Sequence, residues 1–134
     1  MQPHTHRRLD PELCGVPVHL ADGIAQVELV TTDRMRADDH GLVHGGFVFG
    51  VADHAAMLAV NQETVVLGSA DVRLVAPVRV GERLVAHAKL REILAKKHIV
   101  DVEVRSDAGP VLTGAFTCFV PAHHVLAEVD DARR

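Results

Sequence analysis

Alternating apolar and polar residues run through most of the chain and predict a succession of β-strands. In the first part of the chain, Ala25, Val27 and Leu29 alternate with Gln26 and Glu28, the period of two that marks a strand with one covered face. The pattern recurs at Val72, Leu74 and Ala76, at Leu84, Ala86, Ala88 and Leu90, and at His98, Val100, Val102 and Val104, before a nearly continuous apolar strand over 111–120. Because the connections between these later strands are short, neighbouring strands must be antiparallel.

A different pattern, apolar on every side, occupies residues 45–61. The stretch is rich in Ala, Met and Leu, which favours a helix over a strand. A helix without a polar face is expected in the middle of a domain and not on its surface. One strand, this helix and four further strands therefore predict an antiparallel sheet that curls around a buried helix.

The ends of the chain lack such periodicity. Residues 1–9 are polar and predict a tail without a function, followed by a short helical turn with Asp10 as N-cap, Pro11 at its first position and Gly15 as its stop. We therefore divide the chain into a tail and helical turn (1–15), one domain (16–122) and a C-terminal tail (123–134).

Length and charge narrow the class of protein. The chain has 134 residues, enough for one domain. Its 14 Lys and Arg against 18 Asp and Glu give a formal net charge of −4, and aromatic residues make up 3% with no Trp or Tyr. Nucleic-acid-binding proteins carry the opposite charge and stack bases on aromatic side chains. We therefore expect no nucleic-acid partner.

The two cysteines and the apolar segments indicate the compartment. Cys14 and Cys118 lack the spacing of a metal or redox motif, so we interpret them as reduced core residues. Asp53 and His54 interrupt the longest apolar stretch, and residues 1–8 lack the apolar region of a signal peptide. These features predict a cytoplasmic protein without a membrane partner.

Asp53 is the first candidate for chemistry, because it is a carboxylate in the middle of the predicted buried helix. A buried acid needs a partner, a raised pKa or a wet cleft beside it, and each of these suits a general base or a nucleophile. The alternative is a structural Asp53 that bonds to a neighbouring strand or to an arginine such as Arg73.

His44, Gly45 and Gly46 precede this helix and form the second candidate. Glycines let the backbone approach a ligand closely, and the first N–H groups of a helix have no intrahelical acceptor, so they can stabilise an oxygen that gains negative charge. The alternative is that the two glycines only form a tight turn into the helix.

The spacing of the two candidates has a consequence for assembly. Gly45 and Asp53 are 53 − 45 = 8 residues apart, which along a helix is about 12 Å. One reacting carbonyl cannot contact both groups of the same helix. If they act together, they must come from different copies of the chain, which predicts an obligate homo-oligomer with its site at a twofold interface.

The stretch HGGFVFGVAD (44–53), which continues to AVN at 59–61, and the later stretch DVRLVAPVRVGE (71–82) resemble the hotdog-fold acyl-CoA thioesterases of the phenylacetate-pathway (PaaI) type. The similarity covers residues 16–120. It implies an α+β hotdog fold, a long central helix wrapped by a five- to six-stranded antiparallel sheet. It also implies homodimers with a continuous sheet, often paired into homotetramers, that hydrolyse acyl-CoA without a cofactor or a metal.

The resemblance also assigns roles to residues. It implies that Asp53 is the base or nucleophile and that Gly45 offers its N–H to the thioester carbonyl from the opposite subunit. Some relatives carry an Asn six residues before the His; here that position is Asp38, so this auxiliary contact is altered.

Further substrate contacts are expected around these two residues. His44 and Gly46 belong to the same turn, and Asn61, two helical turns beyond Asp53, either lines the acyl pocket or satisfies a strand end. Lys96 and Lys97 are candidates for the phosphates of CoA, because a chain of net charge −4 needs local positive charge to hold a polyanion.

Three other functions fit the sequence less well. A metal site is disfavoured because His40 and His44, although four residues apart, lie in a loop entering the helix and no H-E-x-x-H motif is present. A non-catalytic acyl-CoA sensor usually has a DNA-binding element, and no basic helix is present. A hotdog dehydratase uses a His and acid pair in other sequence surroundings. We expect a thioesterase, with the sensor as the alternative.

Overall fold

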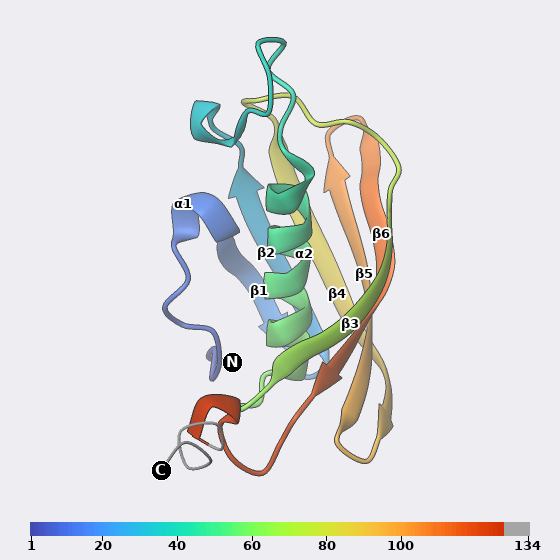
Figure 1. Ribbon diagram of the computed structural model, residues 1–134. Helices are drawn as coiled ribbons and strands as arrows, with labels where there is room; N and C mark the ends of the chain where they lie inside the picture. The colour runs from blue at the N-terminus through green and yellow to red at the C-terminus, as the bar shows by residue number, and fades with distance from the viewer. Residues whose placement is uncertain (128–134) are drawn as a thin grey trace.

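The computed structural model describes residues 1–127 and shows one antiparallel sheet curved around a long helix (Figure 1). The helical elements are α1 (Pro11–Cys14), the 3-10 turn η1 (Asp33–Met35) and α2 (Gly45–Val60). The strands are β1 (Val16–Ala21), β2 (Ile24–Val30), β3 (Val66–Leu74), β4 (Arg83–Leu94), β5 (Lys97–Ser106) and β6 (Gly109–Phe119). This is the expected α+β hotdog architecture.

The sheet has six strands in the order β1-β2-β4-β5-β6-β3, and every neighbouring pair is antiparallel. The alternation in β2, β4 and β5 places one set of side chains against α2, as the sequence predicts: Ala25, Val27, Leu29, Leu84, Ala86, Ala88, Val100, Val102 and Val104 are all buried. Periodicity missed β1, because its residues are exposed or half-buried and no buried alternation marks it.

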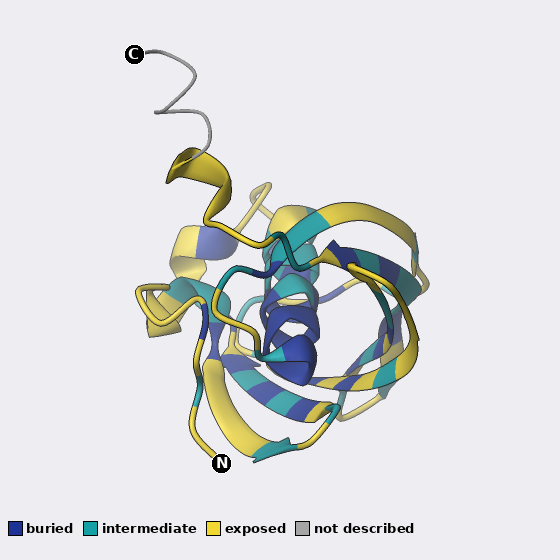
Figure 2. Cartoon of the chain, turned by 90° about the horizontal axis from the view of Figure 1, so that it is seen from below, coloured by how far each residue is buried: buried dark blue, intermediate teal, exposed yellow. Residues whose placement is uncertain are grey.

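Helix α2 lies at the centre of the curved sheet (Figure 2), and 10 of its 16 residues are buried. It begins after His44, whose backbone is extended, and ends at Asn61, whose backbone is left-handed (φ 51°, ψ 41°). Phe49 of α2 stacks on Phe116 of β6 with ring centroids 5.4 Å apart. The prediction of a buried central helix is confirmed.

Strand β3 differs from the sequence prediction. Leu74, expected on an inward face, is 56% exposed, and the following Val75 is 51% exposed. The reason is position: β3 is an edge strand that pairs only with β6, so one of its edges has no strand partner in the part of the chain that the structure describes. Apolar side chains that alternate along an edge strand can therefore remain exposed, because neither the sheet nor the helix of the same chain has to cover them.

The short helical turn α1 forms as predicted. Asp10 caps it by accepting the N–H of Glu12 (2.9 Å), and Pro11 stands at its start. Gly15 ends it with φ 87°, and a Cβ there would lie 2.7 Å from the carbonyl oxygen of Glu28, so glycine is required. Of the C-terminal tail expected over 123–134, residues 128–134 lie outside the described residues.

The N-terminal residues do not form the free tail that their polarity predicts. Thr5 is only 5% exposed. The side-chain amide of Asn61 accepts the N–H of His4 (2.8 Å) and donates to the carbonyl of Gln2 (3.0 Å). The Nε2–H of His6 donates to the carbonyl of Val65 (3.1 Å). These bonds tie residues 2–6 to the end of α2 and to the chain entering β3.

Candidate functional site

The start of α2 presents unoccupied backbone donors. Phe47 donates its N–H to the carbonyl of His44 (3.1 Å), whereas the N–H groups of Gly45 and Gly46 have no acceptor within the described chain. Beside Gly45 is an open pocket of about 320 Å³, whose walls are Leu42, Val43, Val48, Leu74, Val75, Ala76, Pro77 and Val78. The geometry offers an oxygen ligand a helix N-terminus inside an otherwise apolar pocket.

His44 lies beside these glycines but is exposed. Its ring makes an edge contact with the ring of Phe47 (6.1 Å between centroids), and a Cβ on Gly46 would lie 3.0 Å from the same ring. Gly46 thus leaves space for the imidazole against the first turn of the helix. The structure therefore brings His44, Gly45 and Gly46 together, as the sequence predicts.

Asp53 lies halfway along α2 and is half-buried. Its Oδ1 atom is buried without a hydrogen-bond partner, and the described chain contains no ion pair for it. Burial raises the pKa of this carboxyl, and the positive charge of His6 lowers it in part. Among residues 1–127, Asp53 makes no bond to Arg73 or to a neighbouring strand, which was the structural alternative.

Two thiols lie near Asp53. Burial and the charge of Asp53 raise the pKa of the Cys118 thiol to about 12, and burial followed by the charges of Asp10 and Asp53 raises the pKa of the Cys14 thiol. Both cysteines are free, Cys118 buried and Cys14 half-buried. Such thiols are protonated and poorly nucleophilic at neutral pH.

His54, the next residue along the helix, is buried for a structural reason. Its Nδ1 atom lies 2.9 Å from the carbonyl oxygen of Cys14 and links α2 to α1. Burial lowers the pKa of this imidazole, so the neutral ring that donates to the carbonyl is favoured. His54 therefore holds two helices together, on another side of α2 from Asp53.

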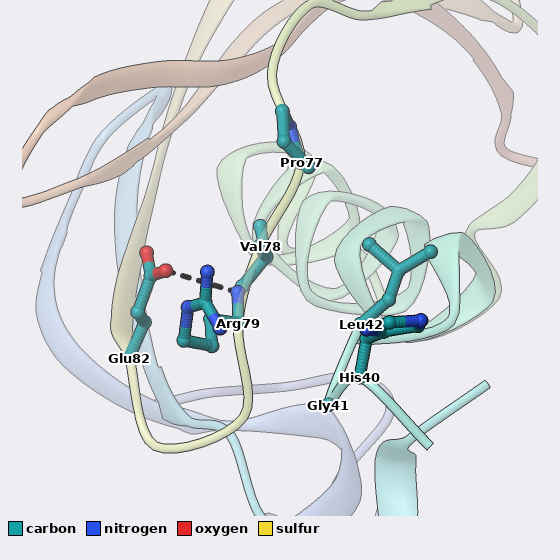
Figure 3. A pocket seen from close by; sticks show the side chains of 7 residues that line it. All are labelled: His40, Gly41, Leu42, Pro77, Val78, Arg79 and Glu82. Carbon is teal, nitrogen blue, oxygen red and sulfur yellow. Dashed lines mark hydrogen bonds between the residues drawn. The ribbon is translucent and has the colours of Figure 1, made fainter. Parts of the chain in front are cut away.

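Asp38 organises the loop before α2. It is exposed, and its Oδ1 accepts the N–H groups of His40 (2.9 Å) and Leu42 (3.1 Å). This loop forms one wall of a second pocket, of about 310 Å³, opposite Pro77, Val78, Arg79 and Glu82 (Figure 3). Asp38 itself does not line either pocket at this end of α2, so its carboxylate acts on the loop.

Asn61, Lys96 and Lys97 lie away from the Gly45 end of the same chain. Asn61 follows the last turn of α2, where both ends of its amide are engaged by the N-terminal segment. Lys96 lies in the turn between β4 and β5, and Lys97 is the first residue of β5, with its Nζ 5.9 Å from the centre of the Phe119 ring. One copy of the chain therefore does not bring all of the predicted substrate contacts together.

Sequence reasoning missed the N-terminal segment, which hydrogen bonds to Asn61 and Val65 attach to the domain. No signal in the sequence marks it, because residues 1–9 are polar and lack periodicity. Its position depends on the amide of Asn61 and the carbonyl of Val65, which are distant in sequence.

Residues 1–127 contain no group of three His, Cys, Asp or Glu side chains arranged to hold a metal ion. None of their helices has the length and apolar character required to cross a membrane.

The chain belongs to the thioesterase superfamily, whose family model matches residues 40–113. This stretch contains α2 and the strands from β3 to β5, and so includes both Gly45 and Asp53.

Two solved structures resemble this chain. An uncharacterized protein from Pyrococcus horikoshii, PH1136, has a crystal structure with 52% sequence identity and a TM-score of 0.92, covering 94% of this chain and 97% of that chain. A mutant of the phenylacetic acid degradation protein PaaI from Thermus thermophilus is 31% identical with a TM-score of 0.75, covering 81% of this chain and 95% of that chain.

One curated relative is named for another activity and is much longer than this chain. The methylthioribose-1-phosphate isomerase of Aquifex aeolicus is 46% identical over 116 residues, which are 87% of this chain. The chain spans only a quarter of the length of that relative, 25%. The similarity therefore concerns one part of the longer protein.

Proposed function

We propose that this protein hydrolyses the thioester of an acyl-CoA to the free acid and CoA, at a site that two copies of the chain share. The observation that carries the proposal is the buried, unpartnered Oδ1 of Asp53, on the same helix whose first N–H groups, at Gly45 and Gly46, have no acceptor. A carboxyl with a raised pKa is a stronger base than an ordinary one. Membership of the thioesterase superfamily supports the reaction class.

The shared site follows from the length of the helix. Because Gly45 and Asp53 are about 12 Å apart along α2, the amide and the carboxylate that act on one carbonyl belong to two copies. The unpaired edge of β3, with Leu74 and Val75 exposed beside the Gly45 pocket, is the surface on which we place the second copy. A homodimer built on this edge continues the sheet from one copy into the next, and two dimers form the tetramer implied by the resemblance.

In the proposed reaction, the thioester carbonyl oxygen accepts the N–H of Gly45, and the start of α2 stabilises the negative charge that develops there. Asp53 of the other copy removes a proton from water, whose oxygen attacks the carbonyl carbon; the C–S bond breaks, and CoA leaves as the thiolate. In the nucleophilic variant of this step, an Asp53 oxygen attacks, CoA thiolate leaves, and water cleaves the mixed anhydride.

The proposed substrate contacts keep the predicted lysines but not Asn61. We assign the acyl group to the apolar pocket beside Gly45, and its size suits an aromatic or a short- to medium-chain acyl group. Lys96 and Lys97 are proposed to contact the CoA phosphates. Asn61, whose amide is already occupied by Gln2 and His4, is left out of the substrate contacts.

The test is the release of thiol from acetyl-CoA, hexanoyl-CoA and phenylacetyl-CoA, measured with a thiol reagent. We expect the wild-type protein to release CoA from at least one of them, and Asp53→Asn to release none while keeping its oligomeric state. Binding of the acyl-CoA without release of thiol would instead establish the non-catalytic sensor. Equal turnover by wild type and Asp53→Asn would remove Asp53 from the mechanism.

A further inference from the structure

We propose that a basic pocket at the start of β3, which contains Arg7 and Arg8, binds the phosphate groups of CoA for the site whose Gly45 amide belongs to the other copy of the chain. The inference rests on the proposed function for the pairing of two copies along β3. The ligand of the basic pocket is the phosphate-bearing nucleotide end of the substrate.

The basic pocket lies where three segments of the chain meet. It has a volume of about 440 Å³ and is lined by residues 5–9 of the N-terminal segment, by residues 63–66 between α2 and β3, and by His124. Figure 1 shows the N-terminal end of the chain near the start of β3, at the end of the sheet away from the start of α2.

Hydrogen bonds hold the N-terminal wall of this pocket in place. The side-chain amide of Asn61 bonds to the backbone at Gln2 and His4 (3.0 and 2.8 Å). His6 donates from Nε2 to the carbonyl of Val65 (3.1 Å). The turn that follows His6 therefore has a defined position beside the start of β3.

The basic pocket gathers positive charge in a chain whose formal net charge is −4. Arg7 and Arg8 are exposed and form none of the ion pairs among residues 1–127. His124 Nδ1 accepts the N–H of Leu126 (3.0 Å), which leaves its Nε2–H as a donor. Glu63 is the one carboxylate among the described residues that line the pocket. Two guanidinium groups without carboxylate partners suit phosphate oxygens, which arginine binds in bidentate pairs.

The pairing of two copies places the basic pocket beside the Gly45 pocket of the other copy. Two copies of one edge strand that a twofold axis relates run antiparallel, so the start of β3 in one copy lies beside the end of β3 in the other. Val66 at the start of β3 lines the basic pocket, and Leu74 at its end lines the apolar pocket beside Gly45. An acyl-CoA held by Gly45 of one copy therefore extends its nucleotide end toward Arg7 and Arg8 of the other.

The same pairing brings the predicted lysines to this site. Val66 of β3 pairs with Phe119 of β6, which pairs in turn with Lys97 of β5. Neighbouring strands are about 4.8 Å apart, so Val66 and Lys97 lie about 10 Å apart at one end of the sheet. Lys96 and Lys97 are distant from Gly45 of their own chain, but the pairing places them, with the two arginines, near Gly45 of the other copy.

Binding of CoA tests the arginines without turnover. The dissociation constant is measured by titration calorimetry for the wild type, for Arg7→Gln/Arg8→Gln and for the control Lys89→Gln/Arg105→Gln, which also removes two positive charges, at exposed positions of β4 and β5. We expect the Kd of CoA to rise about 4- to 25-fold in the arginine variant, since each exposed ion pair contributes a factor of about 2 to 5. The control should keep the wild-type Kd. Pantetheine, which lacks the phosphates, should bind the wild type and the arginine variant equally.

Four results of these titrations overturn the phosphate site: no binding of CoA to the wild type, an unchanged Kd in the arginine variant, an equal rise in the control, or an equal rise for pantetheine. Inorganic phosphate is titrated in the same way. A lower Kd for inorganic phosphate than for CoA would assign the pocket to a free anion and overturn its assignment to CoA.

Mixed dimers test whether the arginines act across the interface. A dimer of one Gly45→Pro chain, which lacks the amide donor, and one Asp53→Asn chain keeps one intact site, whose Asp53, Arg7 and Arg8 all belong to the Gly45→Pro chain. Adding Arg7→Gln/Arg8→Gln to that chain should raise KM for the acyl-CoA, whereas adding it to the Asp53→Asn chain should leave KM unchanged. Equal effects from both chains, or the reverse pattern, overturn the shared phosphate site. Absence of turnover in the wild type would refute the proposed hydrolysis alone, because the CoA titrations still decide the role of the arginines.

Discussion

Gly45 and Asp53 lie on one helix, α2, separated by 53 − 45 = 8 residues, with the N–H of Gly45 free at its start and Oδ1 of Asp53 buried without a partner in the described chain. The helix holds the two groups about 12 Å apart. The relationship makes the amide and the carboxylate separately testable, because each can be removed without moving the other.

Replacing Gly45 with Pro removes the N–H donor and little else. Proline is favoured at the first position of a helix, and the extended backbone of His44 (φ −61°, ψ 129°) suits a residue that precedes proline. We expect Gly45→Pro to lower kcat by about 100- to 1000-fold, the usual effect of losing one oxyanion donor. Gly45→Ala keeps the N–H, and its Cβ makes only ordinary contact with Leu74 (3.7 Å), so it should stay active. Equal kcat values for the Pro and Ala variants would contradict this role of Gly45.

Mixed dimers test whether the site is shared. A dimer of one Gly45→Pro chain and one Asp53→Asn chain has one intact site if each site combines Gly45 of one copy with Asp53 of the other. We expect the two inactive variants, co-expressed with different affinity tags and purified through both tags, to recover up to half of the wild-type turnover. Mixed dimers as inactive as either parent would place both groups in one chain and refute the shared site.

Asp53 should make stability depend on pH. Burial raises its pKa above the ordinary 3.8, so the folded protein holds this proton to a higher pH than the unfolded chain does. The resulting stabilisation is complete below the unfolded pKa and is lost as the pH rises through the folded pKa. The side chain of Asp53→Asn stays neutral at every pH. As the pH rises, the wild type should therefore lose stability relative to this variant, measured as the free energy of unfolding. Urea unfolding at a series of pH values measures the difference; a constant difference would contradict the raised pKa.

Lys96 and Lys97 are expected to act on binding and not on chemistry. Both are exposed and have no carboxylate partner in the part of the chain that the structure describes. Lys96→Gln and Lys97→Gln should each raise KM about 2- to 5-fold with kcat unchanged, since an exposed ion pair contributes about 0.5–1 kcal/mol. Lys89→Gln, an exposed lysine within β4, changes the net charge equally and is the control. Equal KM values for all three variants would assign the CoA phosphates to other residues.

Phe116 should be among the side chains that contribute most to stability. It is fully buried on β6 and stacks on Phe49 of α2, which joins the sheet to the central helix. We expect Phe116→Ala to lower the free energy of unfolding by about 3–5 kcal/mol, the range for a large aromatic removed from a core. Ile93→Ala, at a 56% exposed position on β4, should change it by much less. Chemical denaturation of both variants measures the contrast.

Local patterns were sufficient where a residue's own neighbours decide its structure. The cap of α1 at Asp10 and the stop at Gly15 formed as predicted, because capping and a left-handed backbone depend on adjacent peptide groups. The extent of α2 and the inward alternation of β2, β4 and β5 also followed, because burial of one face imposes the period. Asp53 was recognised as a candidate in the same way, because it is a charged residue at a position where the helical pattern requires an apolar side chain.

The tertiary structure alone decided the features that join distant parts of the chain. No period in the sequence shows that β1 forms one edge of the sheet or that Leu74 is exposed on the other edge strand, β3. Nor does any period show that Asn61 binds the N-terminal segment. These outcomes depend on contacts between residues far apart in sequence, and polar groups such as the amide of Asn61 find partners only once the chain has folded. The sequence by itself determined the helix, its carboxylate and its free amides, whereas the fold determined which charges and surfaces surround them.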